Sequence, residues 1–324
     1  DFEKEFEYQV TGYDAARGEL ENFPVLVRIP AGRVADNSQL AFFDENGTFL
    51  PYEIDTWNAN GESLVWVLVP SFYQNVKITL ASGNEGWTAP NLAHTLWRMA
   101  GYVAVLHLGE DGPEFAGSTV QNIDGLGQLA NGTDAGVANK VAGAVGPARL
   151  ISDTAGWDKA RIKVDNFEGY LDNLANMTVS LWTKHSAELQ VGDSERIFGN
   201  RSNLEDQASG FNVSTYTGVT DKIPVLQARG NPTLNSSAGL DKFIVVKPST
   251  GTNVSWSDTW THLSFSFNYT PNPTIFHIGG ERAAISPNGS GNTLQTTAFA
   301  SILANDTPIS FGNSYDEGQG GLGF

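Results

Sequence analysis

Two acidic residues separated by one residue, Glu53 and Asp55, form the sequence feature closest to a catalytic motif. In a β-strand the side chains of residues i and i+2 point to the same face, so the two carboxylates are expected side by side. Paired carboxylates hydrolyse glycosidic bonds, and a strand motif Glu-x-Asp-x-x-Glu supplies such a pair. Here the last acid is missing, because Asn58 occupies its position. We therefore expect Glu53 and Asp55 to face solvent or to tie down turns.

The five histidines show no zinc-hydrolase pattern, since none stands in a His-x-x-x-His or His-Glu-x-x-His arrangement. His107 and His262 lie within predicted strands beside large apolar residues. A hydrogen-bonded structural role is expected for both. The chain has no cysteine, which excludes disulfides, thiolate zinc sites and a cysteine nucleophile.

Calcium is the metal that the composition favours, because it is bound by carboxylate and carbonyl oxygens in loops. The candidate ligands are two acidic pairs that follow predicted strands, Glu110-Asp111 and Asp316-Glu317. If those strands are neighbours, the two pairs meet at one rim of their domain. Ordinary solvated loop acids are the alternative interpretation, because the spacing matches no EF-hand or nonapeptide repeat.

Sugar binding requires aromatic rings for stacking and polar side chains for the hydroxyl groups. Trp87 and Trp157 lie in or near predicted loops, where a ring could be exposed, and they are the candidate ligand-binding residues. Trp66 and Trp182 lie in the middle of predicted strands, where a core position is expected.

The charge of the chain limits its partners. Its 19 Lys and Arg residues against 36 Asp and Glu residues give a formal net charge of −17. Such a surface repels nucleic acid and anionic lipid, so neither is expected as a partner. No apolar run approaches the roughly 18 residues of a membrane span, so direct membrane insertion is not expected either.

Strands dominate the expected structure, since 35 glycines and only 17% charged residues suit strands joined by many turns. In the first ninety residues, apolar alternation and two Asn-Gly turns predict six strands. They lie at residues 6–10, 24–29, 40–44, 49–54, 62–69 and 75–80. The first core is predicted at Val25, Val27, Leu64, Trp66 and Leu68.

Residues 89–100 alone have helical character, beginning near Pro90 and Asn91. We therefore predict a first domain over 1–90, a linker over 91–100 and a second domain over 101–324. Its strands are predicted at 102–108, 160–164, 177–183, 210–216, 223–228, 243–246, 260–267, 274–278 and 308–312. The Gly- and Ala-rich segment 109–156 should be mostly loop with one or two irregular strands. The second core is predicted at Val105, Leu181, Leu263, Phe265 and Phe267.

Several of these stretches resemble known domains. The first set consists of Asn22–Val27, Phe43-Asp44, Leu50–Asp55 with Trp57, and Val65–Val67 before Pro70. Taken in this order, these stretches are similar to a bacterial β-sandwich domain of unknown function. That family commonly precedes a LamG-like, concanavalin A-like jelly roll, which Tyr102–Leu108, Thr178–Trp182 and Trp260–Leu263 resemble. The resemblance implies an all-β chain: a small N-terminal β-sandwich followed by a concanavalin A-like (LamG-like) jelly-roll sandwich. The final strand of that jelly roll is expected to be missing.

The resemblance implies a non-catalytic binding or adhesion module, secreted or at the bacterial cell surface, which binds a glycan or another surface ligand and belongs to a larger surface protein. One alternative is a glycan-active hydrolase on the same scaffold. Another is a purely structural segment of an envelope protein. Many relatives carry an acidic loop where this chain has Gly117–Asn122, and its loss counts against an inherited calcium site.

Overall fold

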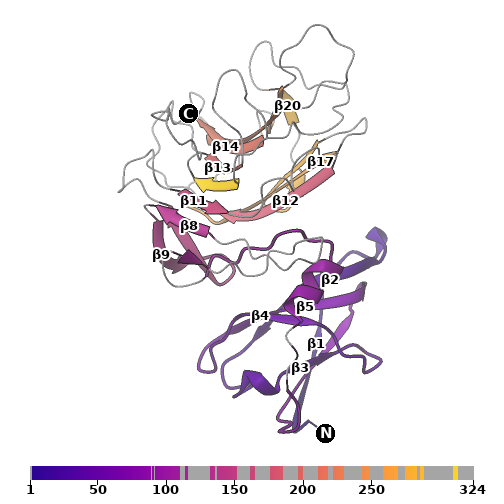
Figure 1. The fold of residues 1–324 in the computed structure, drawn as a ribbon. Helices are drawn as coiled ribbons and strands as arrows, with labels where there is room; N and C mark the ends of the chain where they lie inside the picture. Colours follow the sequence, from indigo (N-terminus) through magenta and orange to yellow (C-terminus); the bar gives the residue numbers. More distant parts are fainter. Residues whose placement is uncertain are drawn as a thin grey trace. The chain divides into compact units, whose positions relative to one another are not determined.

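The computed structural model describes residues 2–88, 90, 92–109, 114–115, 132–135, 137–151, 161–164, 176–184, 196–199, 211–217, 222–229, 243–248, 258–268, 274–282, 285–287 and 309–312. They form two compact units, the first ending at Leu108 and the second containing the strands from Glu114 onward (Figure 1). The regular structure is almost entirely antiparallel β-sheet, which confirms the expected all-β class. Over the described ranges, no helix has both the length and the apolar character needed to cross a membrane.

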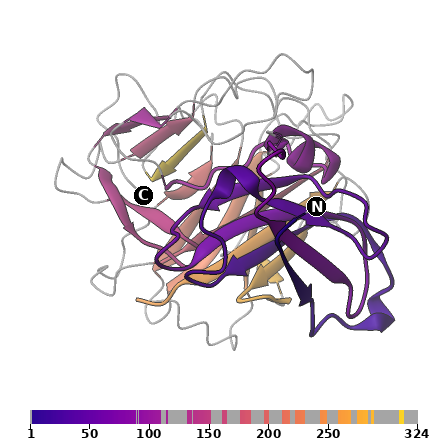
Figure 2. The same ribbon diagram turned by 90° about the horizontal axis from the view of Figure 1, so that it is seen from below.

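The first unit is a β-sandwich of two three-stranded antiparallel sheets, with strand orders β1-β6-β3 and β2-β5-β4. The strands are β1 Lys4–Gln9, β2 Leu20–Ile29, β3 Ala41–Phe43, β4 Tyr52–Thr56, β5 Ser63–Phe72 and β6 Lys77–Ser82. Short 3-10 helices at Ala15–Arg17 and Asn37–Gln39 lie in the connections. Figures 1 and 2 draw this unit in indigo to purple and show strands as its main elements. All six predicted strands are confirmed, with shifted ends.

The two Asn-Gly turns form where the sequence predicts them. Gly47 has a φ of 78°, and the Asp44 carboxylate accepts two backbone N–H groups of this turn at 2.9 and 2.7 Å. Only a single bridge, between Phe43 and Phe49, forms across it. The turn at Asn60-Gly61 connects β4 to its partner β5. The chain therefore crosses from one sheet to the other between β3 and β4.

The core of the sandwich lies between the two sheets. Tyr52 contributes its ring and donates its hydroxyl to the backbone C=O of Leu40 at 2.6 Å. The buried members are Val27, Ile29, Val34, Leu40, Phe42, Leu50, Tyr52, Val65, Val67, Val69, Phe72, Val76, Ile78 and Leu80. Val27 is confirmed as a core residue, and Val25 packs against the cluster from a partly buried position.

Strand β5 is buried on both faces, which explains its uninterrupted apolar sequence. Val65 and Val67 point into the sandwich core. Leu68 and the partly buried Trp66 point the other way and pack against the helix α1, Ala93–Met99. The predicted placement of Leu64, Trp66 and Leu68 in the sandwich core is therefore wrong. Trp66 and Leu68 pack against the helix, and Leu64, which is 4% exposed, alternates onto the same face of β5 as they do.

Residues 92–108 pack on the first unit, where we expected a linker and the start of a second domain. Leu96 and Trp97 are 0% and 3% exposed, and α1 contacts β2, β4 and β5. The predicted strand at 102–108 does not form, and Val105 packs beside α1 instead of in a second core. The physical reason is that the second apolar face of β5 requires a cover, which this segment supplies.

The second unit holds a nine-stranded sheet, a four-stranded sheet and the hairpin β9-β10. The nine-stranded order is β20-β16-β15-β14-β13-β21-β11-β8-β7, and the four-stranded order is β12-β17-β18-β19. The bounds are β7 Glu114–Phe115, β8 Gly132–Ala135, β9 Val137–Ala142, β10 Pro147–Ile151, β11 Arg161–Val164, β12 Asn176–Thr183, β13 Arg196–Gly199, β14 Phe211–Thr217, β15 Lys222–Arg229, β16 Phe243–Pro248, β17 Thr261–Asn268, β18 Thr274–Ile278, β19 Glu281–Arg282, β20 Ile285–Pro287 and β21 Ile309–Gly312.

Eight of the predicted strands in this unit are present with similar bounds. Segment 109–156 contains four strands, β7 to β10, where one or two were expected. Within the four-stranded sheet, Leu263 and Phe265 are fully buried and Ile278 nearly so. The predicted core positions Leu263 and Phe265 are thus confirmed, Leu181 is partly buried, and the side chain of Phe267 lies outside the described residues.

Candidate functional site

Strand β4 places Glu53 and Asp55 on the face of its sheet that α1 covers. Tyr52 points into the sandwich core, so its neighbour Glu53 points the opposite way, directly across from Trp66 of β5. The register between β4 and β5 shifts between Ile54 and Thr56, which places Asp55 at a bulge. Bulges re-aim side chains, and the residue at this bulge, Asp55, contacts His107.

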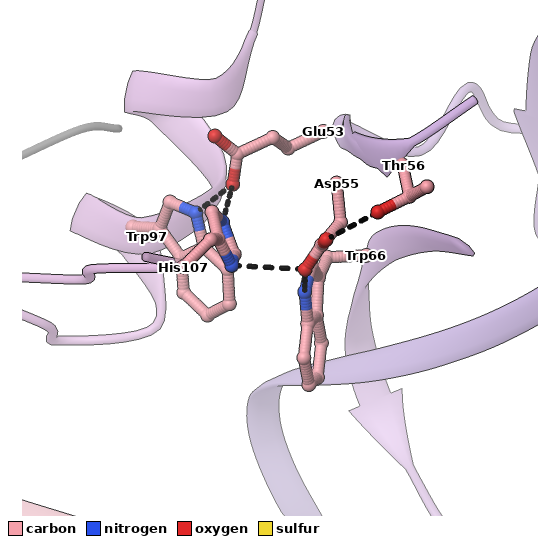
Figure 3. Close-up of polar contacts among 6 residues, drawn as sticks. All are labelled: Glu53, Asp55, Thr56, Trp66, Trp97 and His107. Carbon is pink, nitrogen blue, oxygen red and sulfur yellow. Dashed lines mark hydrogen bonds and ion pairs between the residues drawn. The ribbon is translucent and has the colours of Figure 1, made fainter. Parts of the chain in front are cut away.

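His107 lies between the two carboxylates (Figure 3). Its Nε2 is 3.0 Å from Glu53 Oε2, and its Nδ1 is 2.9 Å from Asp55 Oδ2. The side chains of His107, Glu53 and Asp55 are 14%, 11% and 4% exposed. An ionised carboxylate only accepts hydrogen bonds, so two such contacts require both ring nitrogens to carry a proton. The geometry therefore defines a buried imidazolium held by two carboxylates.

Two tryptophans complete the cluster by donating their indole N–H groups. Trp97 donates to Glu53 Oε2, and Trp66 donates to Asp55 Oδ2 at 3.1 Å. Each of these oxygens thus accepts from His107 and from one indole (Figure 3). Thr56 donates its hydroxyl to the other oxygen of Asp55 at 3.0 Å. We call these six residues the His107 cluster: Glu53, Asp55, Thr56, Trp66, Trp97 and His107.

The electrostatics of the cluster favour its charged form. Burial by itself lowers the pKa of His107, but the hydrogen bonds and negative charges of Asp55 and Glu53 outweigh it and raise that pKa to about 10. Burial likewise acts to raise the pKa of Asp55, whereas the hydrogen bond and charge of His107, with the bonds from Trp66 and Thr56, lower it overall. At neutral pH the imidazole is therefore a cation and Asp55 an anion.

This arrangement suits a structural tie better than glycosidic catalysis. A catalytic carboxyl pair flanks the scissile bond of a bound sugar, whereas here His107 occupies the space between the two acids. The expectation that Glu53 and Asp55 face solvent is wrong, because both are buried and hydrogen-bonded to His107. The expectation of a hydrogen-bonded structural His107 agrees with the contacts, although its segment is not a strand. The cluster fastens segment 102–108 to β4.

A second group of polar side chains lies on one face of the four-stranded sheet. The register pairs Trp182 with His262, Ser180 with Ser264, and Thr178 with Ser266 across β12 and β17. It continues from Ser264 to His277 of β18 and from His277 to Arg282 of β19. We call this surface the Trp182 face, and its members are Thr178, Ser180, Trp182, His262, Ser264, Ser266, Ile275, His277 and Arg282. The opposite face carries the buried Leu263 and Phe265.

Hydrogen bonds between side chains confirm that these residues share a face. Ser180 Oγ lies 2.8 Å from His262 Nε2, and Thr178 Oγ1 lies 3.0 Å from Ser266 Oγ. Trp182 is 49% exposed, and its ring centroid is 5.2 Å from that of His262. Burial and the nearby His277 lower the pKa of His262, so its ring is neutral at neutral pH and can accept or donate. An indole half in water beside hydroxyls and a neutral imidazole is the chemistry of a sugar-stacking surface.

Of the residues proposed from the sequence to bind a ligand or calcium, only Trp87 has a described side-chain environment. Its indole N–H donates to the backbone C=O of Leu40 at 3.0 Å, and its ring packs against Phe2 and Phe49. These contacts give Trp87 a packing role. Trp157 and the predicted calcium ligands Glu110, Asp111, Asp316 and Glu317 lie outside the described residues.

The sequence analysis missed Trp182, for which a core position was expected. The missed signal is its alternation with Thr178 and Ser180, since residues two apart on a strand share a face and these neighbours are polar. Within the part of the chain that the structure describes, no group of three or more His, Asp or Glu side chains is arranged to hold a metal ion.

Comparison with known proteins agrees with part of the expected resemblance. Residues 36–99 match the family model of a domain of unknown function, DUF2341. The match spans β3 to β6 and α1, and includes every member of the His107 cluster except His107 itself. No curated protein and no solved structure matches the chain.

Proposed function

We propose that the chain is a non-catalytic binding module that recognises glycan through its second unit, as part of a secreted or cell-surface protein. The observation that carries the proposal is the Trp182 face, where a half-exposed indole lies among hydroxyl and imidazole groups. The LamG-like, concanavalin A-like assignment of this unit belongs to the same proposal. Its support is the sequence resemblance together with two antiparallel sheets in one unit.

Binding is favoured over hydrolysis by the two polar sites together. In the first unit, Glu53 and Asp55 are engaged by His107. In the second unit, the Trp182 face carries no carboxylate at its described positions. Glycoside hydrolysis by the usual route needs two carboxyl groups about 5 to 10 Å apart in a site open to the sugar. Neither site offers such a pair among its described residues.

A glycan array probed with the full chain tests this function, together with a reducing-sugar assay on every glycan that binds. We expect binding to one class of glycan without release of reducing ends. Retention of no glycan would defeat the proposal, and release of reducing ends would favour the hydrolase. Running the array with calcium and with chelator tests the proposed calcium ligands, which would make binding depend on the ion.

A further inference from the structure

The Trp182 face differs in charge from the rest of this acidic chain. The chain has 36 acidic and 19 basic residues, yet the ionisable groups on the described positions of this face are His262, His277 and Arg282. Glu281 pairs with Ile278 and so belongs to the opposite set of side chains. Lys184, two residues beyond Trp182, is exposed and adds a further cation near the end of β12. The face is therefore basic to neutral in a chain whose net charge is −17.

This local charge selects a class of ligand. Surfaces of one sign attract ligands of the opposite sign, and the negative net charge of the whole chain makes the contrast sharper. A neutral sugar would need no such departure from the average charge of the chain. We propose that the Trp182 face binds an anionic glycan, a polymer whose sugars carry carboxylate or sulfate groups. The proposal rests on the proposed function and adds the ligand class.

The geometry assigns a role to each group. Trp182 stacks against the C–H face of a sugar ring, because its indole is half exposed on the polar face of the sheet. Ser180 and His262, 2.8 Å apart beside it, hydrogen-bond the ring hydroxyls. Arg282 lies on the far strand β19, and its guanidinium pairs with carboxylate or sulfate. Neighbouring strands are about 4.8 Å apart, so the face spans roughly 14 Å from β12 to β19.

The test is affinity electrophoresis of the full chain in native gels. The gels contain alginate or polygalacturonate as carboxylated glycans, carrageenan as a sulfated glycan, and dextran or laminarin as neutral glycans. We expect retardation by an anionic glycan, which weakens as salt is added, and weaker or no retardation by the neutral ones. The carboxylated and sulfated gels separate the two sources of negative charge.

Variants locate the site. Trp182→Leu should weaken the retardation about tenfold, because it removes the aromatic face while keeping an apolar side chain. Trp182→Phe, which keeps a stacking ring, should retain more binding than Trp182→Leu, and a merely structural role would not produce that order. Arg282→Gln should weaken anionic binding and its salt dependence. The matched controls lie in the first unit: Tyr73→Leu, an exposed aromatic, and Arg17→Gln, an exposed cation, should bind as the wild type does.

Each outcome separates the two proposals. If no glycan retards the wild type, the proposed function fails, and the site fails with it. If only neutral glycans retard it, glycan binding stands and the anionic class is wrong. If an anionic glycan retards the wild type, Trp182→Leu and Arg282→Gln equally, glycan binding stands and the Trp182 face is not its site. Circular dichroism of each variant shows that a loss of binding is not a loss of fold.

Discussion

Each unit of the chain holds a histidine beside a tryptophan, and the two histidines differ in their partners. His107 is 14% exposed and contacts two carboxylates, whereas His262 is partly exposed and contacts the hydroxyl of Ser180. The carboxylates raise the pKa of His107 to about 10, while burial and the neighbouring His277 lower the pKa of His262. The first ring is a buried cation and the second a neutral ring at the surface.

The comparison shows that partner and exposure decide the role of these residue types. In the His107 cluster the two carboxylates that contact the histidine are buried, and the cluster fastens segment 102–108 to β4. On the Trp182 face the tryptophan and the histidine are partly exposed to solvent, so a ligand can replace the water that contacts them. The difference predicts a large effect on stability at the first site and a small one at the second.

The largest expected effect follows from His107→Ala. It leaves two buried carboxylates facing each other without a cation, and breaking a buried ion pair by removing one partner costs about 3 to 5 kcal/mol. The free energy of unfolding of the first unit should fall by that amount. Hydrogen exchange measured by mass spectrometry on peptides from β4 and β5 reports it without interference from the second unit.

The control for this variant is Glu62→Ala, which breaks the Arg28–Glu62 pair. Those side chains are each 51% exposed and their charged atoms lie 2.6 Å apart. An exposed pair contributes at most about 1 kcal/mol. If both variants lose the same small free energy, the His107 cluster is not a structural tie.

The second prediction is a loss of first-unit stability in alkali. The pKa of His107 is raised from 6.5 to about 10, so the stability that it contributes is fully present below pH 6.5 and is lost as the pH rises through 10. The pKa of Asp55 is lowered from 3.8, so its contribution is present above pH 3.8 and is lost as the pH falls below that value. Hydrogen exchange protection of β5, corrected for the intrinsic exchange rate, should therefore be highest between these limits.

His107→Gln serves as the control for the alkaline limb, because glutamine fills similar space and does not titrate in this range. Its β5 protection should be lower at pH 6 and should change little between pH 6.5 and 10. A wild-type protein whose first unit is equally stable at pH 6 and pH 9.5 would contradict the assignment of His107 as a buried cation.

Much of the first unit follows from the sequence because alternation and turn residues are local signals. The strands β1 to β6 were predicted from them, and Gly47 adopts the positive φ that its Asn-Gly turn requires. Which side chains of β5 point into the sandwich core, and which point toward α1, could not be predicted in the same way. The apolar run of this strand is buried on both sides, so alternation cannot distinguish Val65 and Val67 from Trp66 and Leu68. The short strands within 109–156 were missed because Gly and Ala leave little alternation to detect.

The site depends on contacts that are distant in sequence. His107 meets Glu53 across 54 residues, and nothing in its own segment identifies that partner. The pairing exists because α1 and the residues after it pack over β5, although the sequence predicted a linker at 91–100 and a second domain from residue 101. The Trp182 face could have been predicted from the sequence, since the alternation of Thr178, Ser180 and Trp182 along β12 is a local signal. General expectation placed Trp182 in the core because most tryptophans are buried.

Glu53→Gln should have an intermediate effect on the stability of the first unit, and it also tests whether the His107 cluster takes part in glycan binding. It keeps an acceptor for the indole N–H of Trp97 but removes a charge beside His107, and hydrogen bonds to charged groups contribute about 1.5 to 3 kcal/mol. The first unit should lose up to that much stability, while glycan binding stays unchanged. A variant that folds but loses binding or a hydrolytic activity would show that the His107 cluster is itself a functional site.

The smallest expected effect on stability follows from His262→Ala, which is the same substitution as at His107. His262 has no carboxylate in contact among the described residues, and its bond to Ser180 lies on an exposed face where water can replace it. A hydrogen bond of this kind contributes about 1 kcal/mol or less to the free energy of unfolding. Thermal unfolding of the second unit should shift little, while retardation by an anionic glycan should weaken.

Ser180→Ala is the control, since it removes the same hydrogen bond and leaves the imidazole in place. If His262→Ala destabilises the second unit by as much as His107→Ala destabilises the first, both histidines are structural, and the contrast between the two sites is wrong.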